Sequence, residues 1–404
     1  MGLDVAAVRA HFPALTTGVA YFDGPGGSQV PGQVADAMAA TLTAGISNRG
    51  PLTAASRLAD DLVAAARSAM ADLLGASPGG IVFGRSMTAL TYDLSRTMAK
   101  GWRDGDEIVV SSLDHDANIR PWMQAASTAP AGARVRVRVA EPDPVTGELT
   151  VATVGAVLSD RTRVVAVTGA SNLVGTRPDL AAIAVLVHAA GGLFVVDGVH
   201  LTPHAPVDVT GLGADVYLCS PYKFLGPHCG VLAAAPDLLE TLHPDKLRPS
   251  TDAVPERFEL GTLPYELLAG TTAAVDFLAA LTPGQPDRRR RLLASMAAVE
   301  EHEAELFDRL LRDLRGIDRV RLVGSPVART PTALFTLEGV DSADVSARLA
   351  AGGVNAPAGS FYAIGAAERF GLGVAGGVRA GLAPYTDNTD VDRLVAGVAA
   401  IAAH

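Results

Sequence analysis

Lysine is scarce in this chain, and one lysine occupies a position suited to covalent chemistry. Lysine occurs only at Lys100, Lys223 and Lys246. Lys223 lies in SPYKFLGP, residues 220–227, directly after an apolar run that we predict to be a strand. Ligands bind at the strand ends of open α/β sheets. Apolar neighbours there would desolvate the lysine and make its amine nucleophilic, so Lys223 is the candidate for covalent catalysis.

A carboxylate ends a second apolar run. Residues 193–196 read as a buried strand, and Asp197 follows them. An aspartate there can pair with the protonated ring nitrogen of pyridoxal phosphate and hold that ring as an electron sink. Asp197 taken alone could also be a turn or helix-capping residue. The strand-end Lys223, 26 residues later, favours the cofactor interpretation.

Composition bounds the class of protein. With 404 residues, 49% hydrophobic and 19% charged, the chain can bury a large core, which excludes a disordered or disulfide-scaffold protein. Its net charge of −10 argues against nucleic acid or an anionic membrane as partner. The two cysteines, Cys219 and Cys229, are expected to be reduced, and no signal peptide is evident, so we expect a cytoplasmic location.

Short apolar runs alternate with helical patterns between about residues 80 and 235, which predicts an α/β architecture. A breaker-rich link at residues 283–286 precedes a long amphipathic helix and a smaller α+β region. We therefore predict a large domain over residues 18–285 and a small domain over 286–404 together with 1–17. The predicted strands of the large domain are 81–84, 107–112, 135–140, 164–170, 193–197, 216–220 and 230–235.

Two motifs give the chain a family resemblance. DGVH, residues 197–200, is similar to the D-x-x-Q/H element of the class V aminotransferases, and residues 220–227 resemble their S-x-H-K-x-x-G-P signature. This is a family of pyridoxal-phosphate enzymes, and the resemblance is to its cysteine desulfurase-like group. It covers most of the chain. It implies the fold type I of these enzymes, with a seven-stranded mixed sheet, a small C-terminal domain and a homodimer.

Further motifs follow in the family's order. VFGRSMT (82–88) resembles the phosphate-binding turn, DHDAN (114–118) the element whose histidine stacks on the ring, and SNLVG (171–175) the asparagine element. RFELGT (257–262) is similar to the loop that reaches the partner's phosphate, and VRAGL (378–382) to the strand that binds the substrate carboxylate. The implied cofactor contacts are Ser86, Met87, Thr88, His115, Asn172, Asp197, His200, Ser220, Tyr222, Lys223, Gly261 and Thr262.

The chain departs from the family where the desulfurases carry a catalytic cysteine on a mobile loop. Residues 353–362 contain no cysteine, and Tyr362 stands about where it would be. Cys219 is expected in the core and Cys229 at a strand start, so persulfide formation is not expected. His200 could hydrogen-bond the ring, transfer protons, or be structural. The implied substrate contacts are Arg379, Arg49 across the dimer, and Tyr362.

The resemblance implies a common mechanism and leaves its outcome open. Lys223 would form a Schiff base with the cofactor and remove the Cα proton of a small amino acid, with His115 and Asp197 as the other catalytic groups. We favour β-elimination, as in a C–S lyase. Transamination is the runner-up and epimerisation a further alternative, and a non-catalytic pyridoxal-phosphate-binding paralogue is the alternative of a different class. No metal is expected.

Overall fold

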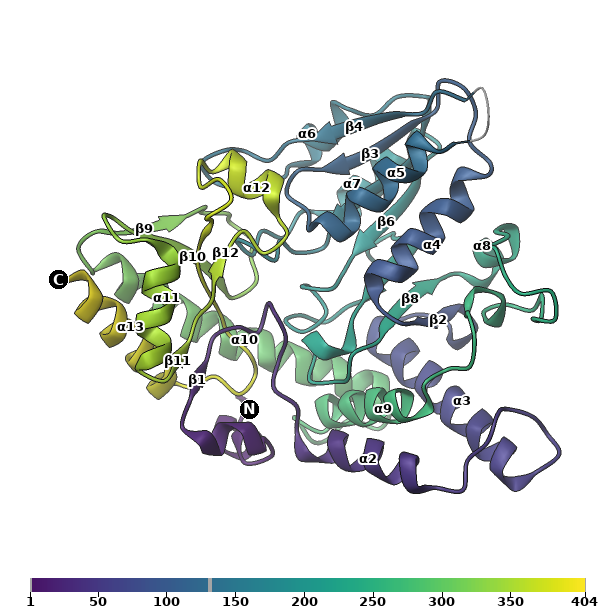
Figure 1. Ribbon diagram of the computed structural model, residues 1–404, viewed down its shortest axis with the longest axis horizontal. Helices are drawn as coiled ribbons and strands as arrows, with labels where there is room; N and C mark the ends of the chain where they lie inside the picture. The colour runs from purple at the N-terminus through teal and green to yellow at the C-terminus, as the bar shows by residue number, and fades with distance from the viewer. Residues whose placement is uncertain (1, 130–132, 404) are drawn as a thin grey trace.

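The computed structural model describes residues 2–129 and 133–403. Its largest element is a seven-stranded sheet in the order β2-β8-β7-β6-β5-β3-β4 (Figure 1). Neighbours among β3 to β7 pair in parallel, whereas β8 is antiparallel to both β2 and β7. The predicted α/β fold with a mostly parallel seven-stranded sheet is confirmed. The strands are β2 (Ile81–Gly84), β3 (Glu107–Ser111), β4 (Arg136–Ala140), β5 (Thr162–Thr168), β6 (Leu193–Asp197), β7 (Val216–Cys219) and β8 (Gly230–Ala234).

Helices cover both faces of this sheet because successive strand residues point to opposite sides. In β5, Val164 and Ala166 pack with α4 (Met87–Ala99) and α5 (Arg120–Ser127). Their neighbours Val165 and Val167 belong to the core on the other face. The helices of that core and its surroundings are α2 (Gly32–Thr43), α3 (Ala54–Leu74), α6 (Val151–Gly155), α7 (Leu180–Ala189) and α9 (Tyr265–Ala279).

A second sheet, in the order β12-β13-β10-β9, forms a separate hydrophobic core on the left of Figure 1. Its strands pair antiparallel. A two-stranded pair, β1 (Ala20–Tyr21) with β11 (Val354–Asn355), brings an N-terminal segment into this region. The remaining elements here are β9 (Val320–Val323), β10 (Thr332–Leu337), β12 (Ala358–Gly359), β13 (Gly377–Gly381), α11 (Ser342–Ala351), α12 (Ile364–Arg369) and α13 (Asn388–Ala402).

One long helix connects the two cores. Helix α10 (Arg288–Arg315) begins after Asp287, whose side chain accepts a hydrogen bond from the amide of Arg290 and caps the first turn. Its first half contributes Leu292 to the core of the large sheet, and its second half contributes Leu310 to the core of the small sheet. Within the described ranges, every helix is too short or too polar to cross a membrane.

Candidate active site

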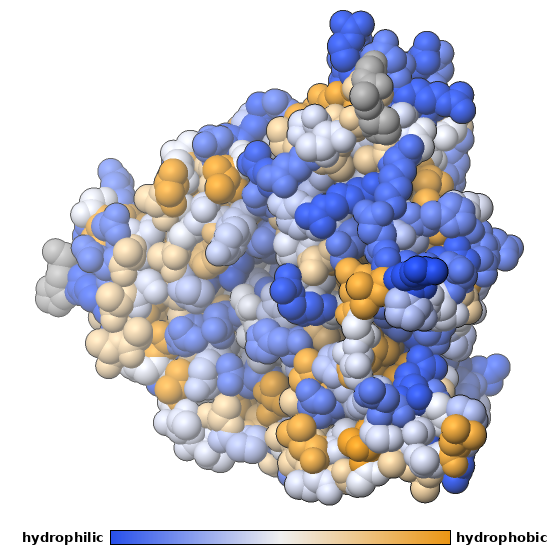
Figure 2. Space-filling model, turned by 45° about the vertical axis from the view of Figure 1, so that its right-hand side comes forward, coloured by the Kyte–Doolittle hydropathy of each residue, from blue (hydrophilic) through white to orange (hydrophobic). Residues whose placement is uncertain are grey.

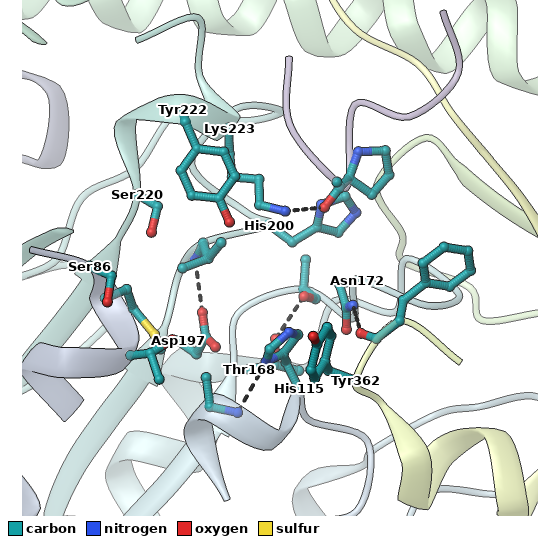
Figure 3. Close-up of a pocket in the computed structure, with 18 of the residues that line it drawn as sticks. Ser86, His115, Thr168, Asn172, Asp197, His200, Ser220, Tyr222, Lys223 and Tyr362 are labelled. Carbon is teal, nitrogen blue, oxygen red and sulfur yellow. Dashed lines mark hydrogen bonds between the residues drawn. The ribbon is translucent and has the colours of Figure 1, made fainter. Parts of the chain in front are cut away.

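A cavity of about 280 Å³ lies where several strands of the large sheet end and the small sheet approaches them (Figure 3). Strands β2, β5, β6 and β7 each deliver residues to it at or just beyond their last position. β13 contributes the guanidinium of Arg379 from the small sheet. Of the residues predicted from the sequence, the cavity is lined by Ser86, Met87, Thr88, His115, Asn172, Asp197, His200, Ser220, Tyr222, Lys223, Tyr362 and Arg379.

One end of the cavity has the form of an anion site. Strand β2 leads through a short turn into α4, and Ser86 caps this helix by accepting a hydrogen bond from Ala89 N at 3.1 Å. Met87 and Thr88 are the first helical residues, so their amides lack the carbonyl partners that interior residues have. Gly230 of β8 passes so close that a Cβ there would lie 2.4 Å from Met87 N. A phosphate group fits this turn.

Lys223 enters the cavity from a short 3-10 turn directly after β7. Its Nζ donates a hydrogen bond to the carbonyl oxygen of Pro25 and lies 4.9 Å from the ring centroid of Tyr222. Burial, followed by repulsion from the cation of Arg379, lowers the pKa of Lys223 to about 7. A large fraction of this amine is therefore neutral and nucleophilic near neutral pH.

Asp197 lies at the end of β6 and is almost fully buried. One carboxylate oxygen, Oδ1, accepts a hydrogen bond from Val199 N at 2.9 Å. Desolvation raises the pKa of Asp197 to about 6, against the opposing effects of that hydrogen bond and of Lys223. A cationic ring nitrogen placed beside Asp197 would favour the charged carboxylate and would itself be held protonated.

His115 forms one wall of the cavity and stacks with Tyr362, with ring centroids 5.2 Å apart and planes 28° from parallel. Its Nδ1 accepts a hydrogen bond from Ala117 N at 3.0 Å, which places the proton of the neutral ring on Nε2. Burial, with Lys223 nearby, lowers the pKa of His115 to about 4. The ring is therefore neutral at physiological pH and can stack on a planar cofactor.

Arg379 is buried opposite Lys223 and has no ion-pair partner among the described residues. Its Nη1 donates to the carbonyl oxygen of Asn172 at 2.9 Å, and its guanidinium lies 3.6 Å from the ring centroid of Phe361. Burial lowers the pKa of Arg379 to about 9, so the group stays cationic at neutral pH. Asp23 lies near enough to act on this cation but forms no ion pair with it, so the guanidinium can bind a carboxylate in bidentate fashion.

Unpartnered polar atoms indicate that this cavity is built for a ligand. Among the described residues, Asn172 Oδ1, His200 Nδ1 and Arg379 Nε are buried and lack a hydrogen-bond partner, and all three side chains line the cavity. Buried polar groups normally have partners, so each such atom requires an explanation. Pyridoxal phosphate fits these residues. Its phosphate matches the turn at the start of α4, its ring nitrogen matches Asp197, and its ring oxygen matches Asn172.

Three predicted residues lie outside this cavity. Arg49 is paired with Asp60 at 2.7 Å and with Glu256 at 3.2 Å, on the surface. Gly261 and Thr262 are exposed. Their predicted role at a neighbouring subunit's phosphate stays a prediction.

Several residues that line the cavity were not predicted from the sequence. Thr168 ends β5, and its position at a strand end was a readable signal. The others lie in turns and loops without a chemical signature of their own. The missed residues are Pro25, Gly26, Ala117, Thr168, Ala170, Val199 and Phe361.

Both cysteines are buried in the core and lie outside the set of residues that line the cavity. Burial raises the pKa of the Cys219 thiol, and it raises that of Cys229 to about 11. Neither thiol is a thiolate at neutral pH, so neither is suited to attack a substrate.

The fold and the cavity together define a fold type I pyridoxal-phosphate enzyme, and comparison with known proteins gives its family. The sequence profile of the class V aminotransferases matches residues 20–394. The chain is 35% identical to an uncharacterized protein of Mycobacterium tuberculosis (99% of this chain, 100% of that one) and 32% identical to a probable cysteine desulfurase of Pseudomonas aeruginosa (95% of both). The crystal structure of the cysteine desulfurase CsdA from Escherichia coli superposes with a TM-score of 0.84, at 27% identity over 98% of this chain and 97% of that one.

This chain therefore belongs to the class V aminotransferase family. The predicted family, the predicted class of enzyme and the predicted cofactor, pyridoxal phosphate, are confirmed.

Proposed function

We propose that this protein is a pyridoxal-phosphate-dependent lyase that eliminates a β-substituent, such as a sulfur group, from a small amino acid. The observation that supports elimination is the composition of the cavity. It combines a lysine of lowered pKa with a carboxylate site, and no cysteine is among the described residues that line it. The leaving group would therefore depart as a free thiol, because the cavity offers no thiolate to accept sulfur.

Arg379 is proposed to bind and orient the substrate. Its guanidinium packs against the Phe361 ring and donates to Asn172 O, and its buried Nε has no hydrogen-bond partner among the described residues. The substrate carboxylate would occupy this donor and fix the position of the α carbon relative to Lys223. The proposed substrate contacts Arg49 and Tyr362 would act at the rim, Arg49 only across a dimer.

Lys223 is proposed to anchor the cofactor and to carry the proton. When bound, pyridoxal phosphate would supply an electron sink for the α carbon, and the charge of Asp197 would hold its ring nitrogen protonated. The neutral Lys223 amine accepts the Cα proton, and the resulting ammonium can return that proton to the leaving group. The Cα–H and Cβ–S bonds break, and a thiol and an α,β double bond form. Hydrolysis then gives a keto acid and ammonia.

Ser86, Met87, Thr88, Ser220 and Tyr222 are proposed to hold the phosphate, and His115, Asn172 and His200 to hold the ring. Ser86 already caps α4, so the phosphate would complete the remaining free amides of that turn. Tyr222 stacks on His228 with ring centroids 4.6 Å apart, which fixes its position beside Lys223.

A homodimer is proposed because the loop bearing Gly261 and Thr262 is exposed beside a surface cavity of about 650 Å³. Phe258 and Leu260 line it, and Leu260 is 61% exposed. Glu259 fixes the base of the loop, because it binds Arg67 and accepts a hydrogen bond from Phe83 N.

Figure 2 shows apolar residues in separate groups among hydrophilic ones on the face that it presents. Sedimentation would test the proposed homodimer, since a monomer at micromolar concentration contradicts it.

We also propose a two-domain division, residues 18–285 and 286–404 with 1–17, because two hydrophobic cores form around the two sheets. The cytoplasmic location is supported by the free, buried state of Cys219 and Cys229.

The reaction is tested by incubating the holoenzyme with a panel of small amino acids that carry a β-substituent, without a keto-acid acceptor. The expected result is a keto acid, ammonia and the released group in equal amounts. Lys100→Ala is the matched control for Lys223→Ala, since Lys100 is an exposed lysine paired with Asp245 at 2.7 Å. If turnover requires a keto-acid acceptor, the reaction is transamination and not elimination. A product racemised at Cα would indicate epimerisation.

A further inference from the structure

A second cavity, of about 380 Å³, lies between α10 and the loop that precedes β10. It is close to the cofactor cavity but separate from it. His204 lines the second cavity and His200 the first, and their rings meet edge to face with centroids 4.9 Å apart. The His200 and His204 rings therefore separate the two cavities at this point.

Buried polar atoms without partners are concentrated at these two places. Eight such side-chain atoms occur in the described part of the chain. Three belong to residues of the cofactor cavity, and three others, His204 Nε2, Glu303 Oε1 and Arg329 Nε, belong to residues of the second cavity. The second cavity thus carries the same sign of an intended ligand as the cofactor site.

Glu303 and His204 are deeply buried residues of this cavity. Their exposed fractions are only 1% and 4%, and Glu303 Oε2 lies 2.8 Å from His204 Nδ1. The carboxylate thus uses one oxygen to accept a hydrogen bond from the ring and leaves Oε1 available. A ligand that donates a hydrogen bond to Oε1 would complete this pair.

Arg329 contributes a positive charge to the second cavity, opposite in sign to the carboxylate of Glu303. Its Nη2 donates to the carbonyl oxygens of Val174 and Thr332, at 2.9 and 2.7 Å, and its guanidinium lies 5.0 Å from the ring centroid of Phe307. No carboxylate pairs with it among the described residues, and burial with the nearby cation of Arg315 lowers the pKa of Arg329 to about 10. The group is cationic at neutral pH and can bind an anion.

The charges limit the ligand to one chemical class. A phosphate or other dianion would be repelled by Glu303, and an apolar molecule would leave three buried polar atoms unpaired. A simple cation would face Arg329 and Arg315. At the mouth, Arg177 is paired with Glu300, while Asp308 is exposed.

We propose that this second cavity binds a small monocarboxylic acid bearing a hydroxyl or amino group, with its carboxylate on Arg329 and its donor on Glu303.

Two residues that line the second cavity are linked to His200, so a ligand in this cavity can affect the cofactor site. One contact is the His204 ring. The other passes through Thr332, whose carbonyl oxygen accepts from Arg329 and whose Oγ1 lies 2.8 Å from His200 Nε2. A ligand that moves Arg329 would change its hydrogen bond to Thr332, and Thr332 in turn contacts His200.

L-lactate is a suitable probe, because it has the carboxylate and the hydroxyl but no amine that could react with the cofactor. Lactate binding is measured by calorimetric titration of the Arg379→Met holoenzyme. This substitution removes the competing carboxylate-binding site in the cofactor cavity. We expect lactate binding to survive in this background and to weaken about tenfold or more when Arg329→Met or Glu303→Gln is added. Arg312→Met and Glu305→Gln, at exposed positions on α10, are the matched controls and should bind as before.

Propionate provides a test that needs no substitution in the second cavity. Because it lacks the hydroxyl, it should bind the Arg379→Met holoenzyme about tenfold more weakly than lactate. The proposal is overturned if no lactate binds in this background, which would mean that the cavity holds water only. It is also overturned if Arg329→Met leaves the affinity unchanged. Neither result depends on turnover, so failure here is distinct from failure of the elimination reaction.

Discussion

The cofactor cavity and the second cavity between α10 and β10 differ in how the chain builds them. The first is assembled at strand ends of one mostly parallel sheet, where Lys223 and Asp197 follow apolar runs. The second joins a turn, a helix and a loop, and its central pair, His204 and Glu303, is 99 residues apart in sequence. Both hold buried polar atoms without partners. A ligand site can therefore be defined by packing alone, without a motif.

The largest effect on turnover is expected from Lys223→Ala, a substitution in the cofactor cavity. The variant removes both the covalent anchor and the group that accepts the Cα proton, so turnover should fall about a thousandfold or more. Keto-acid production at saturating substrate measures it. Lys246→Ala, at a half-buried lysine paired with Asp252, should retain turnover. Comparable loss in both variants would contradict the assignment of Lys223.

Asp197→Asn should have the next largest effect. The amide keeps the shape of the side chain but removes the charge that holds the ring nitrogen protonated, so turnover should fall about a hundredfold while the cofactor stays bound. Turnover and cofactor content, measured together, separate the two effects. Full activity with bound cofactor would show that the ring nitrogen has another partner.

The pH dependence of turnover sharpens the role of Lys223. Its pKa is lowered to about 7, and only the neutral amine accepts a proton. Below that pKa the ammonium form dominates, so the rate should fall by about tenfold per pH unit on the acid side and level off above it. His115, with a pKa lowered to about 4, stays neutral over this range. A rate that is flat between pH 5 and about 8 would exclude Lys223 as the base.

Glu303→Gln should have the smallest effect on turnover and a measurable one on stability. It replaces the charged acceptor of the buried His204 ring by a neutral amide, which should lower the free energy of unfolding by about 1–3 kcal/mol. Denaturant unfolding measures this, with the exposed Glu305→Gln as the control. A thousandfold loss of turnover would place Glu303 in the chemistry and remove the distinction between the cavities.

Most of the predicted site residues line the first cavity, because they coincide with the ends of secondary-structure elements. Asp197 and Lys223 stand where apolar runs stop, and Ser86 stands where a strand pattern changes to a helical one. Those changes of period mark strand ends, which converge in a parallel sheet. The alternation of strands and helices followed from the same signals, whereas the order of the strands in the sheet was not predicted.

Apart from Thr168, the residues that were missed lack such a signal. Phe361 is placed under Arg379 by a loop in which it and Tyr362 both have positive φ angles, of 52° and 60°. Neither aromatic residue type predicts that conformation. Glu303 belongs to an amphipathic helix whose polar residues are mostly solvated, and only the fold turns this one inward. Tertiary contact decided both positions.

The visible absorption spectrum of the purified protein tests the central claim most directly, namely that pyridoxal phosphate is bound in this cavity through Lys223. The account predicts a yellow protein whose absorption band is absent from Lys223→Ala and changes on addition of a substrate amino acid. A protein that stays colourless with added pyridoxal phosphate, or a band that is unchanged in Lys223→Ala, would contradict it.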